Sequence, residues 1–188
     1  MAIAALRHVL PLAHPADALL RRHFQEHPKL GAKDRAFVAE TVFGVLRHRI
    51  TLEHLAPRPA PRILVLAYLA RFQGFNLRQL TPLTDEADTG WLAKLKGVPA
   101  DTLPLEARAE FPGWLLEKLR SIMAEDEILA LGRFLQQSAP LDLRVNTLSA
   151  NRGEVLDILR KDGIEGEPTP YSPVGISLNE KPAINSHP

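Results

Sequence analysis

The residues with the plainest metal-binding spacing are His23 and His27, with Glu26 beside them. Two histidines at i and i+4 share one helix face, and a neighbouring Glu can act as a base, so this H-x-x-E-H pattern is typical of a zinc peptidase family. Pro28 ends the helix directly afterwards, two arginines precede the pattern, and the sequence supplies no obvious third ligand. We therefore interpret the pair as a basic helix C-terminus, where a protonated histidine suits the helix dipole, and predict no metal site.

The chain lacks the residues for cysteine-based chemistry and for a glycine-rich cofactor loop. It contains no cysteine, which excludes disulfides, cysteine-based zinc or iron–sulfur sites and a cysteine nucleophile. Its 11 glycines form neither G-x-G-x-x-G nor G-x-x-x-x-G-K-[ST], so the usual loop for a nucleotide or S-adenosylmethionine is missing. The acidic run 125–127 is placed to open a helix, where negative charge is stabilising. We predict no catalytic and no cofactor-binding residue in this chain.

Basic residues around one strongly helical segment are the best candidates for binding a partner. Lys33 and Arg35 lie at its start, and Arg47 and Arg49 lie three to four turns further on. Exposed cations in a row are what phosphate binding requires, so we predict phosphate contacts for these four residues and also for Arg22. The alternative is that some of these cations instead form ion pairs with nearby carboxylates, those of Asp34, Glu40 and Glu53.

The charge distribution supports an anionic partner for the first third of the chain. The 188 residues carry 23 Lys and Arg against 22 Asp and Glu, a net charge of +1. Residues 1–62 hold ten of those bases but five of the acids, together with six of the seven histidines. A basic region within a nearly neutral protein indicates an anionic partner such as nucleic acid, although a chance bias in a mixed-charge surface gives the same count.

The elements that position these residues are helices as far as about residue 135. Apolar residues recur at three- and four-residue spacing over about 34–56, with Asp34 as a candidate N-cap and Gly44 permitting close helix–helix approach. The segment 62–73 is apolar nearly all round, which predicts a central helix. Residues 74–111 are interrupted by glycine and proline, with one short helix expected around 89–96. Regular helix resumes near 112–120 and 124–137.

The pattern changes after Pro140. Residues 141–147 alternate apolar and polar, as in a half-buried strand, so Arg144 and Asn146 are expected to share one face. Asn151 with Glu154 forms a capping box that opens a helix closed by Gly163. Residues 166–171 have an extended character, and 175–178 predict a second strand. The fold class expected is therefore α+β, a mostly helical domain (1–138) followed by a partial β-α-β subdomain (139–188).

Two blocks of sequence resemble known families. Residues 30–47, running from Leu30-Gly-Ala-Lys-Asp-Arg to Gly-Val-Leu-Arg47, together with Ala16-Asp-Ala-Leu-Leu-Arg21, are similar to the signature of the NusB-like RNA-binding fold. Pro112-Gly-Trp-Leu115, residues 139–148, 151–156 and 168–178 are similar to the N-terminal half of the Sun/NOL1/NOP2 family. Members of that family are S-adenosylmethionine-dependent methyltransferases that make 5-methylcytosine in ribosomal RNA, and the bacterial small-subunit branch carries a NusB-like domain in front.

The resemblance implies an N-terminal fragment that binds small-subunit ribosomal RNA for a Rossmann-like methyltransferase domain beyond residue 188. S-adenosylmethionine and two cysteines would belong to that absent domain, and Arg144 and Asn146 would face RNA or that domain. Two alternatives stay open: a stand-alone NusB-type antitermination factor, or a protein-interaction module docking on a catalytic domain. The sequence has no basic leader and no apolar run long enough to cross a bilayer, so a cytoplasmic protein is expected.

Overall fold

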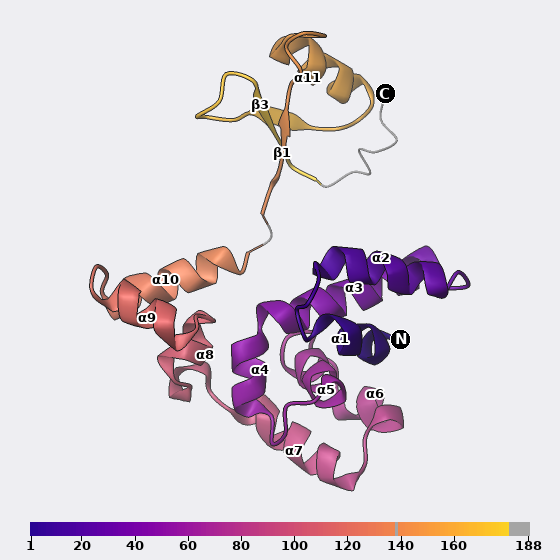
Figure 1. The fold of residues 1–188 in the computed structure, drawn as a ribbon, viewed down its shortest axis with the longest axis vertical. Helices are drawn as coiled ribbons and strands as arrows, with labels where there is room; N and C mark the ends of the chain where they lie inside the picture. The colour runs from indigo at the N-terminus through magenta and orange to yellow at the C-terminus, as the bar shows by residue number, and fades with distance from the viewer. Residues whose placement is uncertain (138, 181–188) are drawn as a thin grey trace. The chain divides into compact units, whose positions relative to one another are not determined.

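The computed structural model describes residues 1–137 and 139–180, which form two compact units, 1–136 and 137–188. Figure 1 traces the chain from the helical first unit to the second unit, which contains the strands. The α+β, mostly helical fold class expected from the sequence is confirmed. The first unit contains the helices α1 (Ala2–Val9), α2 (Ala16–Glu26), α3 (Ala32–Arg47), α4 (Arg49–Leu55), α5 (Pro61–Arg71), α6 (Leu77–Leu80), α7 (Glu86–Gly97), α8 (Leu105–Ala109), α9 (Gly113–Arg120) and α10 (Glu125–Leu135), with 3₁₀ turns at Thr81–Leu83 and Ala100–Thr102.

Helix α5 lies at the centre of the first unit, as its apolar sequence predicts. Every residue from Leu64 to Ala70 is buried, and α5 contacts α1, α3, α4 and α7. A helix buried on all sides needs no polar face, which is why its apolar residues follow no stripe. The core around it takes further buried side chains from α1, α3 and α4, among them Leu6, Val42 and Leu52.

The single helix expected over about 34–56 is two helices. Helix α3 begins after Gly31, so Asp34 is in its first turn rather than at its N-cap, and α3 ends at Arg47. His48 breaks the run with φ −106° and ψ 27°, and α4 continues from Arg49. The close approach expected at Gly44 is present, because a Cβ at this position would overlap the ring of Tyr68 in α5. These contacts set the position of Arg47 and Arg49 at the α3–α4 junction.

Residues 74–111 contain more helix than their glycines and prolines suggest. The short helix expected around 89–96 is α7, which extends over Glu86–Gly97 and begins with a capping box between Asp85 and Asp88. Asp88 is buried and accepts a hydrogen bond of 2.6 Å from Arg62 on α5. This contact between Arg62 and Asp88 holds the start of α7 against the central helix. No local sequence pattern predicts the contact, because its two residues are far apart in the chain.

Helices α8, α9 and α10 build a smaller core of their own within the first unit. Its buried side chains include Leu105, Phe111, Leu116 and Ile128. At Gly132 of α10 an added Cβ would lie 2.5 Å from the carbonyl oxygen of Ala109, so the α8–α10 crossing requires glycine. Both helices contribute side chains to the site described below.

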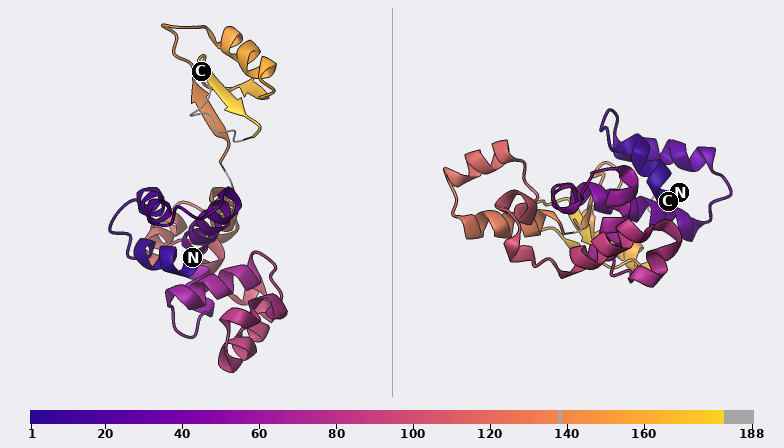
Figure 2. Two further views of the ribbon diagram at one scale, coloured as in Figure 1. Left: turned by 90° about the vertical axis from the view of Figure 1, so that its right-hand side faces the viewer. Right: turned by 90° about the horizontal axis from the view of Figure 1, so that it is seen from below.

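The second unit packs one helix on a three-stranded antiparallel sheet. Its elements are β1 (Leu141–Arg144), α11 (Arg152–Lys161), β2 (Gly166–Pro168) and β3 (Gly175–Leu178), with sheet order β1-β3-β2. Figure 2 shows α11 beside the sheet. Buried Val145, Leu159, Ile176 and Leu178 form the core between them.

The β-α-β order expected for the second unit is extended by one strand. The segment expected only to be extended, 166–171, contains β2, and the turn after it returns the chain as β3. In this hairpin β3 runs antiparallel to β2, and on its other edge β3 pairs antiparallel with β1. The capping box at Asn151 and Glu154 is confirmed, with both hydrogen bonds formed, and Gly163 ends α11 at φ +76°.

The segment 181–188, through which the resemblance would lead into a further domain, lies outside the described residues. Among the described helices, none combines the length and the hydropathy that a membrane crossing demands.

Candidate nucleic-acid interface and an arginine-lined cavity

Lys33 and Arg47 are the two predicted phosphate contacts whose side chains are free. Both are exposed, and neither has a hydrogen-bond or ion-pair partner among the described residues. They lie near opposite ends of α3, so 14 residues of helix separate them by about 21 Å along its axis. Cations in this state can bind phosphate without first breaking an internal contact. Phosphate binding at these two positions stays a prediction.

The other three predicted cations of this unit already have partners. Arg35 donates to the carbonyl oxygens of Leu30 and Pro28 at 2.9 and 3.3 Å, which holds the turn before α3. Arg49 pairs with Glu53 at 2.6 Å. The exposed Arg22 pairs with Glu26 at 3.0 Å. The ion-pair alternative thus describes Arg49, with Glu53 as its carboxylate.

Arg144 and Asn146 differ in how free they are. Arg144 is exposed at the end of β1 and lines a shallow groove with the fully exposed Tyr171. Asn146 is exposed beyond the strand, but its side chain holds a turn: Oδ1 accepts from the Leu148 amide, and Nδ2 donates to the Ser149 hydroxyl. Arg144 can therefore reach a partner directly, whereas Asn146 would first have to release its turn.

The H-x-x-E-H residues lie at the end of α2, as expected. Nδ1 of His27 lies 2.8 Å from the carbonyl oxygen of His23, and the two rings are 4.4 Å apart between centroids. His23 is buried, and its burial together with the neighbouring His27 and His8 lowers its pKa. The part of the chain that the structure describes contains no group of three or more His, Asp or Glu side chains placed to hold a metal ion.

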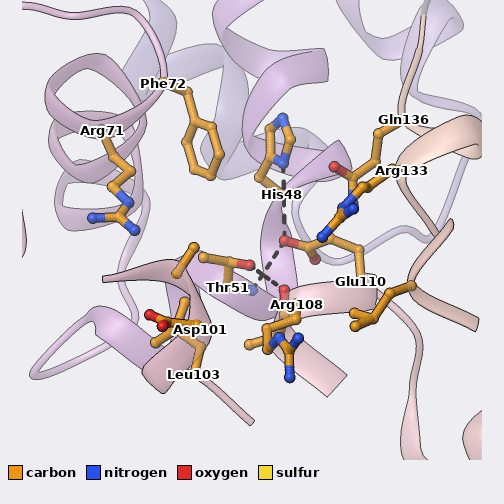
Figure 3. Close-up of a pocket in the computed structure, with 13 residues that line it drawn as sticks. His48, Thr51, Arg71, Phe72, Asp101, Leu103, Arg108, Glu110, Arg133 and Gln136 are labelled. Carbon is orange, nitrogen blue, oxygen red and sulfur yellow. Dashed lines mark hydrogen bonds and ion pairs between the residues drawn. The ribbon is translucent and has the colours of Figure 1, made fainter. Parts of the chain in front are cut away.

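A cavity of about 430 Å³ lies between the α4–α5 and α8–α10 regions of the first unit. Figure 3 shows arginine side chains around it, with the rings of His48 and Phe72 on one side. Its lining consists of His48, Thr51, Arg71, Phe72, Ala100, Asp101, Leu103, Ala107, Arg108, Glu110, Leu129, Arg133 and Gln136. This volume falls within the range of about 300–1,000 Å³ that is usual for small-molecule sites.

Glu110 organises one wall of the cavity. Its carboxylate accepts hydrogen bonds from the backbone amides of Ile50 at 2.9 Å and Thr51 at 3.2 Å, and so caps the first turn of α4 from sixty residues away. The Thr51 hydroxyl donates to the carbonyl oxygen of Ala107. Glu110 itself adopts φ +56°, a left-handed conformation at the end of α8 that is unusual for a side chain of this kind. The α4–α8 junction is therefore fixed by buried hydrogen bonds.

His48 is neutral in this environment. Burial, reinforced by the neighbouring Arg47, lowers the pKa of His48 to about 4, while burial raises the pKa of Glu110. The 3.9 Å contact between His48 Nδ1 and Glu110 is therefore not an ion pair near neutral pH. His48 instead stacks on Phe72, with ring centroids 3.9 Å apart and 11° between the planes. The two rings form an aromatic wall of which Phe72 is 39% exposed.

Three arginines from three different helices line the cavity. Arg71 donates through one nitrogen to the carbonyl oxygens of Leu95 and Val98 at 3.1 and 2.6 Å. Arg108 has a 3.4 Å contact with Glu125, whose side chain is 59% exposed. Arg133 is exposed and has no hydrogen-bond or ion-pair partner among the described residues. Two carboxylates, Glu110 and Asp101, line the cavity with these three arginines. Of the three, Arg133 is therefore the arginine whose hydrogen-bond donors have no acceptor among the described residues.

Sequence reasoning missed this site entirely. Arg71, Arg108 and Arg133 are spread over more than sixty residues and belong to no motif. Arginine near the end of a helix is common because it suits the helix dipole, so none of these positions by itself indicates a binding site. Only the packing of α8 and α10 against the α4–α5 region brings the three together. The positive φ of Glu110 has no sequence signal either.

Comparisons with known proteins find ribosomal RNA methyltransferases among the proteins that this chain resembles. Residues 111–185 match the family model of the ferredoxin-like domain of RsmF/B-like methyltransferases. A curated relative, the probable ribosomal RNA small subunit methyltransferase B of Synechocystis sp. (strain ATCC 27184 / PCC 6803 / Kazusa), is 28% identical over 199 residues. The resemblance to the N-terminal region of the Sun family is confirmed. The matched region covers 88% of this chain but 44% of the relative, so the chain spans about half the length of that relative.

The solved structures add a likeness in fold. The crystal structure of PH0851 aligns with 97% of this chain and 48% of its own, at a TM-score of 0.58 and 20% sequence identity. At that identity the likeness concerns the fold alone. The family match begins at Phe111 and so includes α9 and α10, which pack with α8 in the first unit. The region that matches the family model is therefore not limited to the strands of the second unit.

Proposed function

We propose that this chain is the RNA-binding N-terminal part of a cytoplasmic S-adenosylmethionine-dependent ribosomal RNA (cytosine-5) methyltransferase, and that it positions small-subunit rRNA for a catalytic domain. The proposal rests on the similarity to the probable ribosomal RNA small subunit methyltransferase B of Synechocystis, which extends over 88% of this chain. A NusB-like first domain, residues 1–138, would supply most of the RNA contacts. The second domain, from residue 139, would adjoin the catalytic domain.

The surface of α3 supports the RNA-binding part of the proposal. Lys33 and Arg47 are exposed and unpaired among the described residues, so their charges are available to phosphate. Arg144 offers a third free cation, in the second unit. Arg22, Arg35 and Arg49 are secondary candidates, because each already has a partner within its own unit. Asn146 belongs with these secondary candidates, because its side chain holds a turn.

Charge reversal on α3 tests this proposal. The double variant Lys33→Glu with Arg47→Glu should weaken binding of a fluorescently labelled small-subunit rRNA fragment to the whole chain, measured by fluorescence anisotropy. The slope of log affinity against log salt should become shallower by about 0.7 for each phosphate of a single strand that the variant no longer neutralises.

The matched control reverses two exposed cations of α9, Lys118→Glu with Arg120→Glu. It changes the net charge by the same amount and should leave more of the affinity than the α3 variant does. Equal losses in the two double variants would mean that general charge, not the α3 surface, attracts RNA. Unchanged affinity in the α3 variant would show that Lys33 and Arg47 are not phosphate contacts.

The residues of this chain do not fit S-adenosylmethionine, which the resemblance implies for the full-length protein. The described strand that leads into a helix is β1, and the connection to α11, residues 145–151, contains no glycine. A backbone loop of the usual kind needs glycine there to approach a cofactor closely. The chain also has no cysteine. We therefore assign it no part in the methyl transfer itself.

A second candidate function is docking on the catalytic domain, and exposed apolar side chains favour it. Helix α9, the turn after it and α10 expose Trp114, Ile122, Phe134 and Leu135, each by 60% or more. Large exposed apolar groups on neighbouring elements are typical of protein contacts. Apolar docking would respond little to salt, whereas RNA binding would weaken steeply as salt rises. A pull-down of the separately expressed catalytic domain at low and high salt distinguishes the two functions.

A further inference from the structure

We propose that the cavity of the first unit binds one nucleotide of single-stranded RNA, with its phosphate on Arg133 and Arg108 and its base against Phe72. This inference rests on the proposed RNA-binding function and names a site for it away from α3. Figure 3 shows the groups concerned, with arginines on several sides and the His48 and Phe72 rings on one.

The polar groups of the cavity call for an acceptor-rich ligand. The carboxylate of Glu110 is already occupied by the amides of Ile50 and Thr51, and the Thr51 hydroxyl by the carbonyl oxygen of Ala107. Arg133 has no partner among the described residues, and the contact of Arg108 with Glu125 is long and exposed. A phosphate group accepts hydrogen bonds from arginine in two-pronged geometry, so it fits the donors of Arg133 and Arg108. The cavity also holds the carboxylate of Asp101, which Figure 3 shows away from Arg133, so the phosphate belongs on the Arg133 side.

The remaining walls suit a flat, weakly polar group. Phe72, Leu103, Ala107 and Leu129 line the cavity as apolar side chains. Phe72 is held at a fixed angle by its stacking on His48, yet keeps 39% of its surface exposed. Unstacked RNA bases are commonly held on aromatic rings or on guanidinium planes. A cavity of about 430 Å³ with a cationic and an apolar side therefore fits a nucleotide better than a bare phosphate.

Binding of cytidine 5′-monophosphate to the whole chain tests the site directly. We expect chemical-shift changes in ¹H–¹⁵N NMR spectra at residues 71–72, 108–110 and 133–136, with a weaker response to cytidine alone or to inorganic phosphate alone. Arg133→Glu should weaken binding of the nucleotide by about tenfold or more, because a charge-assisted hydrogen bond is lost and a repulsion is added. Arg120→Glu, a change at an exposed arginine on α9 outside the cavity, should leave it unchanged.

A second variant guards against a purely electrostatic explanation. Phe72→Leu keeps an apolar side chain but removes the ring, so it should weaken binding of the nucleotide by about tenfold while affecting inorganic phosphate little. Shift changes outside the cavity, or equal effects of Arg133→Glu and Arg120→Glu, would overturn the inference. A poly-glutamate peptide that binds the cavity more tightly than the nucleotide would assign it to an acidic protein and overturn it too.

The same variants in the RNA-binding assay separate this inference from the proposed function. Arg133→Glu should lower the affinity for the rRNA fragment beyond what Arg120→Glu does. RNA binding that is intact in both cavity variants would reject the cavity site and leave the proposed function standing. Nucleotide bound in the cavity without any RNA binding by the chain would reject the proposed function and the RNA origin of the ligand.

Discussion

At the scale of single residues, burial changes the protonation of the His48 ring. The pKa of its ring is lowered to about 4, mainly by burial. The ring stacks on Phe72 and lies 3.9 Å from the carboxylate of Glu110. Because the folded state resists protonation down to about pH 4 while the unfolded chain takes up its proton near pH 6.5, the stability due to the neutral ring is present above pH 6.5 and is lost as the pH falls towards 4.

Replacement of His48 should remove this pH dependence. The folded chain should lose roughly 3 kcal/mol of unfolding free energy through His48 between pH 7 and pH 4, and His48→Phe, which keeps an aromatic ring against Phe72, should lose correspondingly less. Urea unfolding followed by circular dichroism at several pH values measures the difference. The exposed His54→Gln serves as the control. Parallel pH profiles for His48→Phe and the parent chain would show that His48 does not titrate as described.

Gly44 offers a second test at the residue scale. A Cβ at this position would overlap the ring of Tyr68, so Gly44→Ala should destabilise the chain by about 1–3 kcal/mol through overpacking. Gly90 in α7 has no heavy atom within 4 Å of its hypothetical Cβ, so Gly90→Ala should be neutral or stabilise by up to about 1 kcal/mol through helix propensity. Thermal unfolding of the two variants distinguishes packing from propensity. Two substitutions with the same sign would contradict the α3–α5 contact.

At the scale of elements, the ends of helices are held in two different ways. Helix α11 is capped locally, since Asn151 and Glu154 exchange hydrogen bonds within one turn. Helix α4 is capped from a distance by Glu110, a residue of the α8 terminus. Local caps are visible in a sequence, because their partners lie three residues apart. Distant caps are visible only when the chain has folded.

The local cap makes a prediction for α11. Asn151→Ala should destabilise this helix by about 1 kcal/mol, since the amide of Glu154 loses its acceptor. Hydrogen exchange of the whole chain should then show faster exchange over residues 152–161. Asn76→Ala, the same change at the capping residue of α6 in the first unit, should leave exchange in α11 unaltered. Slower exchange in α11 of the Asn151 variant would contradict the capping role.

The distant cap makes a parallel prediction for α4. Thr51→Val keeps the shape of the side chain but leaves the carbonyl oxygen of Ala107 without its donor. The loss of this buried hydrogen bond should cost about 1–3 kcal/mol. Thr89→Val removes a hydroxyl bond to the Asp85 carbonyl on the surface of α7 and is the exposed control, with a much smaller expected cost. Chemical unfolding measures both, and equal costs would argue against a buried α4–α8 junction.

At the scale of the whole molecule, the chain has separate apolar cores. The core around α5 and that of α8–α10 belong to residues 1–136, and that of Ile176 and its neighbours belongs to the second unit. Ile176→Ala should therefore destabilise the second unit by about 2–5 kcal/mol. Hydrogen exchange should accelerate in β1, β3 and α11 and stay unchanged in α5. Acceleration in α5 as well would show that the two units unfold together.

The sequence by itself determined the features that depend on neighbouring residues. The apolar run of α5, the glycine at position 44, the capping box of α11 and the change from helix to strand after Pro140 all follow from local spacing. The family resemblance was also readable, because it rests on contiguous blocks such as 139–148. The extra strand β2 was missed, because three residues containing glycine and proline carry no strand pattern of their own.

Only the tertiary structure decided which charges are free and where a ligand can enter. Lys33 and Arg35 look alike in the sequence, yet Arg35 is held by backbone carbonyls and Lys33 is not. The cavity exists because α8 and α10 bring Arg108 and Arg133 to the same space as Arg71. Local propensity acts over a few residues, whereas pairing, burial and cavities depend on segments that meet only when the chain packs.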